Sequence, residues 1–127
     1  MSEPRTSQKI QTSKTPVDPL PDMPLDPAQI TEGNPVARGT VSHQSADKKV
    51  SSGFWSCSEG QFDWTFTWDE FVRIIEGDVT ITEEGGDTYD LGPNDTAHFP
   101  CGLKAHWHVK KAVRKFFVIR TPEPFEL

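Results

Sequence analysis

Cysteine and long apolar runs are both scarce in this 127-residue sequence. Its two cysteines, Cys57 and Cys101, have no C-x-x-C spacing, so we expect two separate thiols in a reducing compartment rather than a disulfide. No apolar run approaches the roughly 20 residues of a membrane-spanning helix. The N-terminus also lacks the apolar segment of a signal peptide. We therefore expect a cytoplasmic protein with no membrane partner.

Basic residues are also few. The chain carries 13 Lys and Arg against 19 Asp and Glu, which gives a formal net charge of −6. Proteins that bind nucleic acids more often present an excess of positive charge. We therefore expect no nucleic-acid partner. The length suits one domain with its own core.

Proline is concentrated near the N-terminus, where residues 1–35 hold seven of the 11 prolines. Apolar residues in this segment are few and unpatterned, so it cannot bury enough surface to offset the entropy of ordering it. Asp26 followed by Pro27 is a typical start of a short helical turn. We divide the chain into a Pro-rich irregular tail, residues 1–35, which either lies against the domain or is disordered, and a domain, residues 36–127.

From residue 36 onward, turn signals recur at intervals of roughly eight to twelve residues, which is typical of an all-β sandwich or barrel. The predicted strands are residues 37–42, 50–57, 61–67, 71–76, 79–83, 88–91, 96–99, 104–109 and 112–119. We expect a turn at Gly77 and no long helix. The pattern therefore predicts an all-β domain.

The most informative stretch runs from residue 62 to residue 77. Its aromatic residues alternate with polar ones, so in a strand they share one face; they are Phe62, Trp64, Phe66 and Trp68. A charged corner, Asp69-Glu70, follows. In the next strand one face carries Glu70, Val72 and Ile74, and the other carries Phe71, Arg73 and Ile75. Both faces are largely apolar, as in a strand buried on both sides.

This stretch resembles the first motif of the cupin superfamily, in which a Gly and a His-x-His precede a Glu and a second Gly. Glu70 and Gly77 have the final spacing of that motif, and its two histidine positions fall at Trp64 and Phe66. Pro100-Cys101-Gly102 matches the second motif, whose histidine position falls at Ala105. The framework of both motifs is present, and the metal ligands other than Glu70 are replaced.

The chain is also similar to small cupins related to ureidoglycine aminohydrolase. The segments that carry this resemblance are Gly53-Phe54-Trp55, Phe62-Asp63-Trp64, Glu70 to Gly77, Phe99 to Gly102, Trp107 to Val109 and Val113-Arg114-Lys115. The resemblance covers about residues 36–120. It implies a cupin fold, the double-stranded β-helix or jelly-roll barrel, with a pocket in its mouth. It also implies a homodimer made by pairing sheets, for which the outward Phe71 and Ile75 need cover.

The motif frame puts Glu70 in this pocket, as a general base or an anchor for a ligand. The second catalytic candidate is His98, which either reaches the pocket or packs under a turn. The ligand-binding candidates are Trp64, Phe66, Arg73 and Trp107. The aromatic residues either stack on a planar ligand or simply fill the barrel. Arg73 either clamps an anion, pairs with a carboxylate or lies in an interface.

Glu70 among aromatic rings would be desolvated, and this has a consequence for stability. A desolvated carboxylate costs free energy, so Glu70→Gln is expected to leave the melting temperature nearly unchanged or to raise it. Unfolding of that variant would instead mark Glu70 as the structural partner of Arg73 or Arg114.

Metal binding in proteins usually takes three or four side-chain ligands. If Ala105 points inward, alternation sends His106 and His108 outward. We therefore expect no metal and no other cofactor. A divalent metal, if present, would be held by Glu70 with His98, His106 or His108. For His106 and His108 this requires a bulge that reverses the faces of their strand.

Two functions are compatible with these residues. The first is a module that binds a small organic molecule in an aromatic-lined barrel pocket, with degenerate metal-ligand positions. The alternative is a small-metabolite enzyme of hydrolase, isomerase or lyase type, similar to ureidoglycine aminohydrolase, that uses Glu70 and histidines with or without a metal. The sequence leaves open whether the chain is an enzyme.

Overall fold

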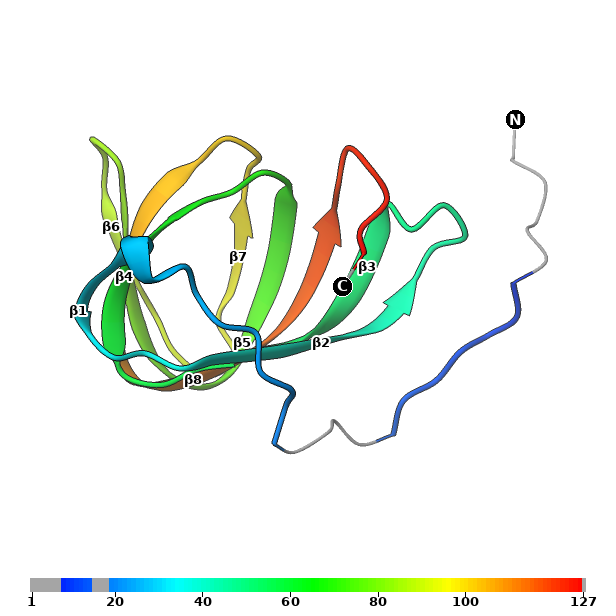
Figure 1. Cartoon of the computed structure of the whole chain (residues 1–127), viewed down its shortest axis with the longest axis horizontal. Coiled ribbons are helices and arrows are strands. Elements are labelled where there is room, and N and C mark those ends of the chain that lie inside the picture. The colour runs from blue at the N-terminus through cyan, green and yellow to red at the C-terminus, as the bar shows by residue number, and fades with distance from the viewer. Residues whose placement is uncertain (1–7, 15–18, 127) are drawn as a thin grey trace.

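The computed structural model describes residues 8–14 and 19–126, and nearly all of its regular structure is β (Figure 1). In chain order the elements are a 3-10 turn η1 (Pro27–Gln29), β1 (Ile30–Gly33), β2 (Ala37–Gln44), β3 (Val50–Cys57), β4 (Gly60–Thr65), β5 (Asp69–Glu83), β6 (Thr88–Leu91), β7 (Thr96–Phe99) and β8 (Lys104–Arg120). The predicted all-β class is confirmed, and β3, β6 and β7 have the predicted bounds. Within the described residues, no helix is long and apolar enough to cross a membrane.

Two long antiparallel strands, β5 and β8, organise the fold. One edge of β8 pairs with β4 through residues 104–109 and with β3 through residues 113–120. Its other edge pairs with β5, which itself pairs with β7 near its start and with β6 near its end. Each long strand therefore pairs with two shorter strands and with the other long strand. The whole sheet curls into the half-barrel of a jelly roll (Figure 1). We expected two separate strands in place of each, and that expectation was wrong.

Gly77 bends β5 instead of ending it. Its φ of 100° lies in the region that favours glycine, and a Cβ there would be 2.3 Å from the carbonyl oxygen of Ala112 in β8. The buried positions of β5 change from even numbers, as at Ile74, to odd numbers, as at Val79, across this point. Gly77 therefore lies in a β-bulge, not in the predicted turn, and lets two paired strands bend together.

The segment before the domain packs against it. The turn expected at Asp26 is η1, with the Asp26 carboxylate accepting a hydrogen bond from the Ala28 N–H at 3.0 Å. Strand β1 pairs with β4, and Leu20 is buried. Part of the predicted irregular tail, from Leu20 to Gly33, is therefore a structural strap on the sheet, and Figure 1 shows it crossing β2 on its way to η1. The boundary at residue 35 stays a prediction, and residues 1–7 and 15–18 lie outside the described residues.

The core lies on the concave side of the curled sheet, where alternate side chains of each strand point. Its buried apolar residues include Phe62, Phe66, Val72, Ile74, Val79, Ile81, Phe99, Trp107, Val109, Val113, Phe117 and Ile119. The outward face of β5 is not covered within one chain, because Phe71 is 50% and Ile75 41% exposed. The expected burial of both faces is therefore absent in the single chain, and the homodimer stays a prediction.

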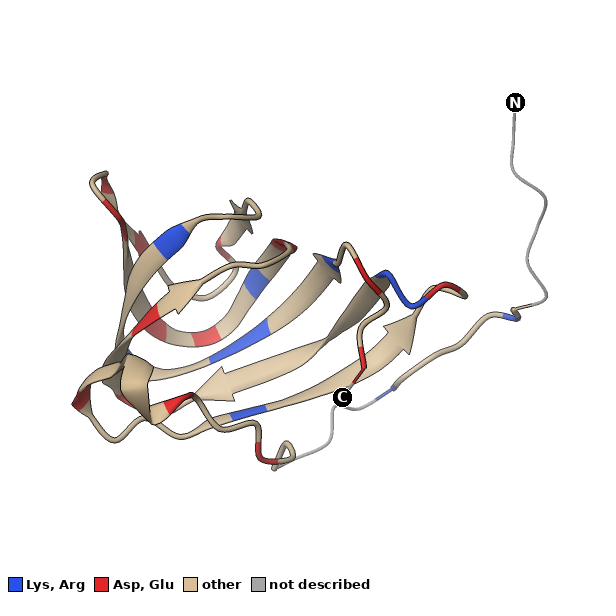
Figure 2. Cartoon of the chain, turned by 45° about the horizontal axis from the view of Figure 1, so that its top comes forward, with Lys and Arg blue, Asp and Glu red and all other residues tan. Residues whose placement is uncertain are grey.

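The tip of the β5–β6 hairpin is acidic (Figure 2), in keeping with the negative net charge.

The two cysteines are free, as predicted, and differ in their environment. Burial raises the pKa of the Cys57 thiol from 9.0 to about 12, whereas Cys101 is exposed. Because the thiolate is the reactive form, we expect a maleimide to label Cys101 rapidly and Cys57 only after unfolding. Peptide mapping of native and urea-treated protein tests this. With Cys101→Ser the native protein should take up almost no label, and rapid native labelling of Cys57 would contradict the packing described.

Candidate ligand-binding site

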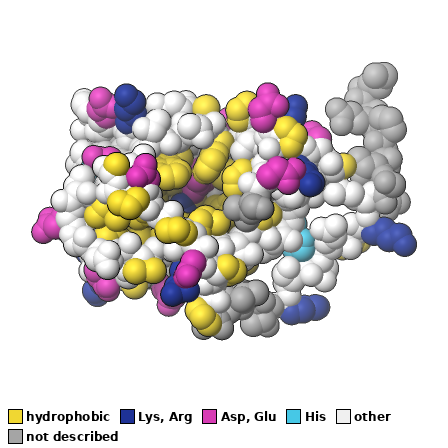
Figure 3. Space-filling view, in the orientation of Figure 1, with side chains coloured by type: hydrophobic (Ala, Val, Ile, Leu, Met, Phe, Trp, Pro, Cys, Tyr) yellow, Lys and Arg dark blue, Asp and Glu magenta, His cyan; other side chains and the backbone are white. Residues whose placement is uncertain are grey.

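The concave side of the sheet holds a cavity of about 120 Å³ that is partly open to solvent. Its wall is almost entirely apolar and aromatic, and the residues that line it are Met23, Leu25, Trp55, Phe62, Trp64, Phe66, Trp68, Glu70, Trp107, Lys115, Phe117, Ile119 and Phe125. In Figure 3 hydrophobic side chains surround a hollow, with acidic and basic atoms visible inside it. The cavity therefore combines a wide apolar wall with a small charged region.

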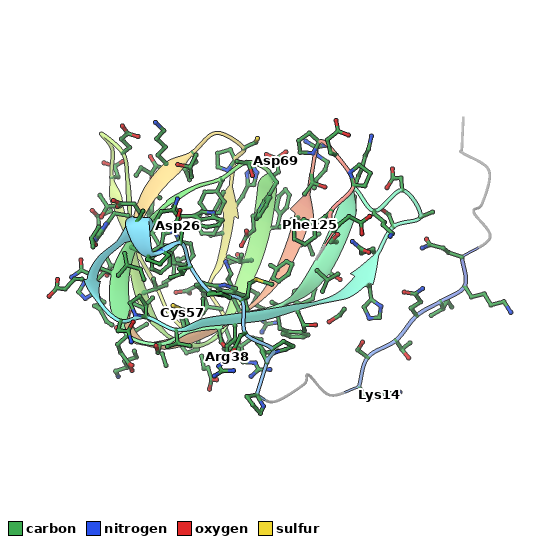
Figure 4. All side chains as sticks on the ribbon, viewed as in Figure 1. Lys14, Asp26, Arg38, Cys57, Asp69 and Phe125 are labelled. Atoms are coloured by element: carbon green, nitrogen blue, oxygen red, sulfur yellow. The ribbon has the colours of Figure 1, made fainter. Side chains whose placement is uncertain are left out.

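Residues distant in the sequence build this wall. The strands β3, β4, β5 and β8 each supply side chains at inward positions of their alternation. Met23 and Leu25 come from the strap before η1. Phe125, labelled in Figure 4, comes from the segment after β8. Its N–H donates a hydrogen bond to the Lys48 carbonyl in the β2–β3 loop, and its carbonyl accepts one from the Gln44 side chain at the end of β2. Both chain ends therefore help to close the cavity.

The charged region is an ion pair between Glu70 and Lys115. Glu70 Oε2 and Lys115 Nζ are 2.5 Å apart, and the two residues are only 5% and 6% exposed. The indole Nε1 of Trp68 donates a hydrogen bond to Glu70 Oε1 at 3.0 Å. Both carboxylate oxygens therefore have a partner, which offsets much of the cost of burying the charge.

Aromatic rings enclose the ammonium group on its other sides. Lys115 Nζ lies 4.6 Å from the ring centre of Trp55 and 4.9 Å from that of Trp107. A cation within about 6 Å of a ring centre is attracted to the face of the ring. Lys115 thus interacts with one carboxylate and two indoles, and the pair together carries no net charge.

Lys115 lines the cavity, and the sequence patterns did not lead us to predict it as a site residue. The signal was present, since residues 113, 115, 117 and 119 alternate inward in one strand and only the second of them is charged. The sequence offered Arg73 or Arg114 as the partner of Glu70 in case its role were structural, and the structure places Lys115 there instead. A lysine on the apolar face of a strand needs a buried counter-charge, and Glu70 supplies it.

The predicted aromatic residues are brought together at the cavity. Phe66 is buried and stacks on Phe99 with 4.8 Å between ring centres, while Trp64 is partly buried and packs against Trp68. Trp107 stacks on Phe62. The Nε1 of Trp107 is the one buried side-chain nitrogen or oxygen, among the residues described, that has no hydrogen-bond partner. Trp107 therefore brings an unused donor to the wall of the cavity.

Two predicted site residues lie away from the cavity, on the outer face of β5 and β7. Arg73 donates a hydrogen bond to the Asn94 side chain at 2.8 Å. The side chain of His98 is 49% exposed and stacks on Phe71, with 4.4 Å between ring centres. Neither lines the cavity, so we do not retain Arg73 for ligand binding there or His98 as a partner of Glu70.

The remaining histidine candidates also point outward. Ala105, Trp107 and Val109 are buried, so the expected alternation of β8 is present without a bulge at this point. Both ring nitrogens of His106 face oxygens of neighbouring side chains, Asp63 and Gln61, at 2.8 Å each. No group of three His, Cys, Asp or Glu in residues 8–14 and 19–126 is arranged to hold a metal ion. The donors around Glu70 therefore do not fit the metal centre that the cupin motifs imply.

Known proteins share this architecture. The sequence matches the model of the EutQ-like cupin domain over residues 44–117. None of the curated proteins matches the chain. The solved EutQ protein of Clostridium difficile is 21% identical with a TM-score of 0.64, and the match covers 77% of this chain and 75% of that one.

Two further solved structures agree with this fold. A protein of unknown function from Pseudomonas syringae pv. tomato is 23% identical with a TM-score of 0.71, over 78% of this chain and 43% of that one. A cupin superfamily protein of Desulfitobacterium hafniense is 17% identical with a TM-score of 0.57, over 67% and 77%. At these identities the likeness concerns the fold alone. Because the family model spans more than half of the sequence, the chain belongs to the EutQ-like cupin domain family.

Proposed function

We propose that this protein binds a small, uncharged organic molecule that has a planar apolar part and one polar group. The observation that carries the proposal is the cavity, whose aromatic wall ends on the neutralised pair Glu70–Lys115. Apolar concave sites with a few placed polar groups are the usual form of small-molecule sites. The rings would hold the planar part, and the ion pair would face the polar group.

The size of the cavity limits the ligand. A dry cavity of about 150 Å³ is enough to hold benzene, and this one measures about 120 Å³. A single six-membered ring or a short branched chain is therefore the scale of ligand that fits. Larger ligands would have to move Met23, Leu25 or Phe125, which come from the two ends of the chain.

The charge of the site favours neutral ligands. A cationic ligand would have to compete with Lys115 for Glu70, and an anionic ligand would have to compete with Glu70 for Lys115. Either exchange leaves a buried charge unpaired, which is costly. A neutral hydroxyl group can instead donate to a free lone pair of the carboxylate. A carbonyl or hydroxyl oxygen can accept from the spare N–H bonds of Lys115 or from the unpaired Trp107 N–H.

We expect this preference to appear in a series of probes with one shape and different charge. Benzyl alcohol and benzamide should quench tryptophan emission with dissociation constants about tenfold lower than those of benzylamine and benzoate, a difference of about 1.4 kcal/mol. Fluorescence titration, supported by thermal shift, measures it. Tighter binding of benzylamine or of benzoate would mean that the ion pair opens for a charged ligand and that the neutral class is wrong.

A pair of variants locates the binding. Trp64→Leu removes an aromatic wall of the cavity and should weaken benzamide binding. Tyr89→Leu removes an aromatic ring of β6 that does not line the cavity and should leave the binding unchanged. Equal effects of the two variants would place the probe outside the cavity.

We also propose that the site works without a transition metal. The Glu70 oxygens already face Lys115 and Trp68, and the predicted histidine ligands His98, His106 and His108 face away. We expect no stoichiometric divalent metal after dialysis of protein purified without a His tag, as measured by elemental analysis. Metal that is retained by the wild type and lost in Glu70→Ala would reverse this proposal.

The enzymatic alternative, including an activity like that of ureidoglycine aminohydrolase, is a weaker proposal. It relies on Glu70 with histidines, and none of the described residues that line the cavity is a histidine. A binding module needs only the aromatic wall and the Glu70–Lys115 pair, and the cavity has both. The cytoplasmic location, the absence of nucleic-acid and membrane partners, and the homodimer stay predictions.

A further inference from the structure

We infer that the ligands of this cavity include small aldehydes, which Lys115 captures as a protonated imine. The inference rests on the proposed function, since it gives a chemical class to the ligand of the same cavity. Its basis is the position of an amine at the wall of an apolar cavity, 2.5 Å from a carboxylate.

Lys115 differs from every other lysine that the structure describes. Its seven counterparts, Lys9, Lys14, Lys48, Lys49, Lys104, Lys110 and Lys111, are exposed, while Lys115 is 6% exposed and lines the cavity. Lysines in apolar surroundings are the ones that proteins use for Schiff bases. The position of Lys115 at the wall of the cavity gives a small carbonyl compound access to its amine.

The reaction balances with the groups present. Glu70 takes one proton from the Lys115 ammonium, and the freed lone pair forms a C–N bond with the aldehyde carbon, whose oxygen takes the electron pair of the C=O bond. A second proton moves from the nitrogen to this oxygen and gives a carbinolamine. Glu70 returns the proton to the carbinolamine oxygen, the C–O bond breaks and water leaves. The two protons that nitrogen loses are those of the water. The sum is an ammonium and an aldehyde converted into an iminium and water, with no oxidant or reductant.

The site stabilises the iminium product as well as the ammonium form of Lys115. The iminium keeps the positive charge of the ammonium, so it keeps the attraction of Glu70 and of the Trp55 and Trp107 rings. An imine carbon and its substituents are planar, which matches the aromatic walls. The apolar lining also disfavours the return of the water molecule needed for hydrolysis.

Reductive trapping tests the inference on the full-length protein. Benzaldehyde is added with sodium cyanoborohydride, which reduces the iminium to a stable secondary amine, and the modified lysines are identified by peptide mapping. We expect Lys115 to be labelled at least about tenfold faster than Lys110, because the cavity raises the local concentration of the aldehyde. The preference should disappear in urea. Labelling confined to exposed lysines, or a preference that persists in urea, would overturn the inference.

Two further measurements separate this inference from the proposed function. Lys115→Arg keeps the positive charge beside Glu70 but cannot form an imine, so it should lose the fast labelling. Since this variant can also lose the fold, the site-resolved labelling of the wild type decides by itself. Benzyl alcohol, which has no carbonyl group, reports binding alone. If it quenches tryptophan emission while Lys115 stays unlabelled, the binding function stands and the imine is wrong; if neither occurs, both fail.

Discussion

Lys115→Met is expected to lower the free energy of unfolding by about 3–5 kcal/mol, the usual result of removing one partner from a buried ion pair. Methionine fills a similar volume, so packing is largely kept. The loss arises because the Glu70 carboxylate stays buried, with only the Trp68 N–H beside it. Urea denaturation followed by circular dichroism measures the change.

A matched control and a double variant complete this test. Lys110→Met removes an exposed lysine of the same strand that approaches Asp78 at 3.7 Å and Asp90 at 3.5 Å, and should cost less than about 1 kcal/mol. Glu70→Gln with Lys115→Met removes both charges, so it should recover much of the stability lost in Lys115→Met. If the double variant is as unstable as Lys115→Met, the loss is one of packing and not of charge.

The ion pair also reverses one expectation drawn from the sequence. Without a partner, the carboxylate of Glu70 costs free energy, so Glu70→Gln should be neutral or stabilising. With Lys115 beside it, the same substitution leaves a buried ammonium with only two aromatic rings and an amide. We now expect Glu70→Gln to lower the melting temperature.

The second large effect is expected at the bend of β5. Gly77→Ala should cost more than about 4 kcal/mol, because it combines an unfavourable φ with a contact against backbone. The added methyl group would lie 2.3 Å from the Ala112 carbonyl oxygen and 2.6 Å from the Val113 Cα. These atoms belong to β8, which cannot move away without breaking its pairing with β5. Thermal unfolding or the yield of folded protein measures the loss.

Gly102→Ala is the control for the backbone angle. Its φ is 93°, close to the 100° of Gly77, and no atom lies within 4 Å of the added Cβ. It should therefore cost only the backbone strain, about 1–3 kcal/mol. The excess loss in Gly77→Ala measures the close approach of β5 and β8. Equal losses in the two variants would show that the strands separate at the bend.

The sequence by itself determined the all-β class and which side chains share a face within a strand. Alternation of side chains is a local property, since successive residues of a strand point to opposite sides whatever the partner strand is. It placed Glu70, Val72 and Ile74 on one face of β5 and Phe71 and Arg73 on the other, and the structure buries the first of these faces. It also placed Trp107 inward and His106 outward. The motif frame, being a pattern of such local spacings, indicated the cupin fold.

Only the tertiary structure decided which residues meet. Glu70 and Lys115 are 45 positions apart, and the register of β5 on β8 brings them into contact. By local preference Gly77 would lie in a turn. In the structure it lies in a β-bulge, because β8 continues beside it. The strap from Leu20 to Gly33 shows no period of its own, and it is ordered by an exposed edge of β4 and by the apolar cavity wall. Contacts between distant segments depend on register and curvature, which the spacing of residues within one strand does not encode.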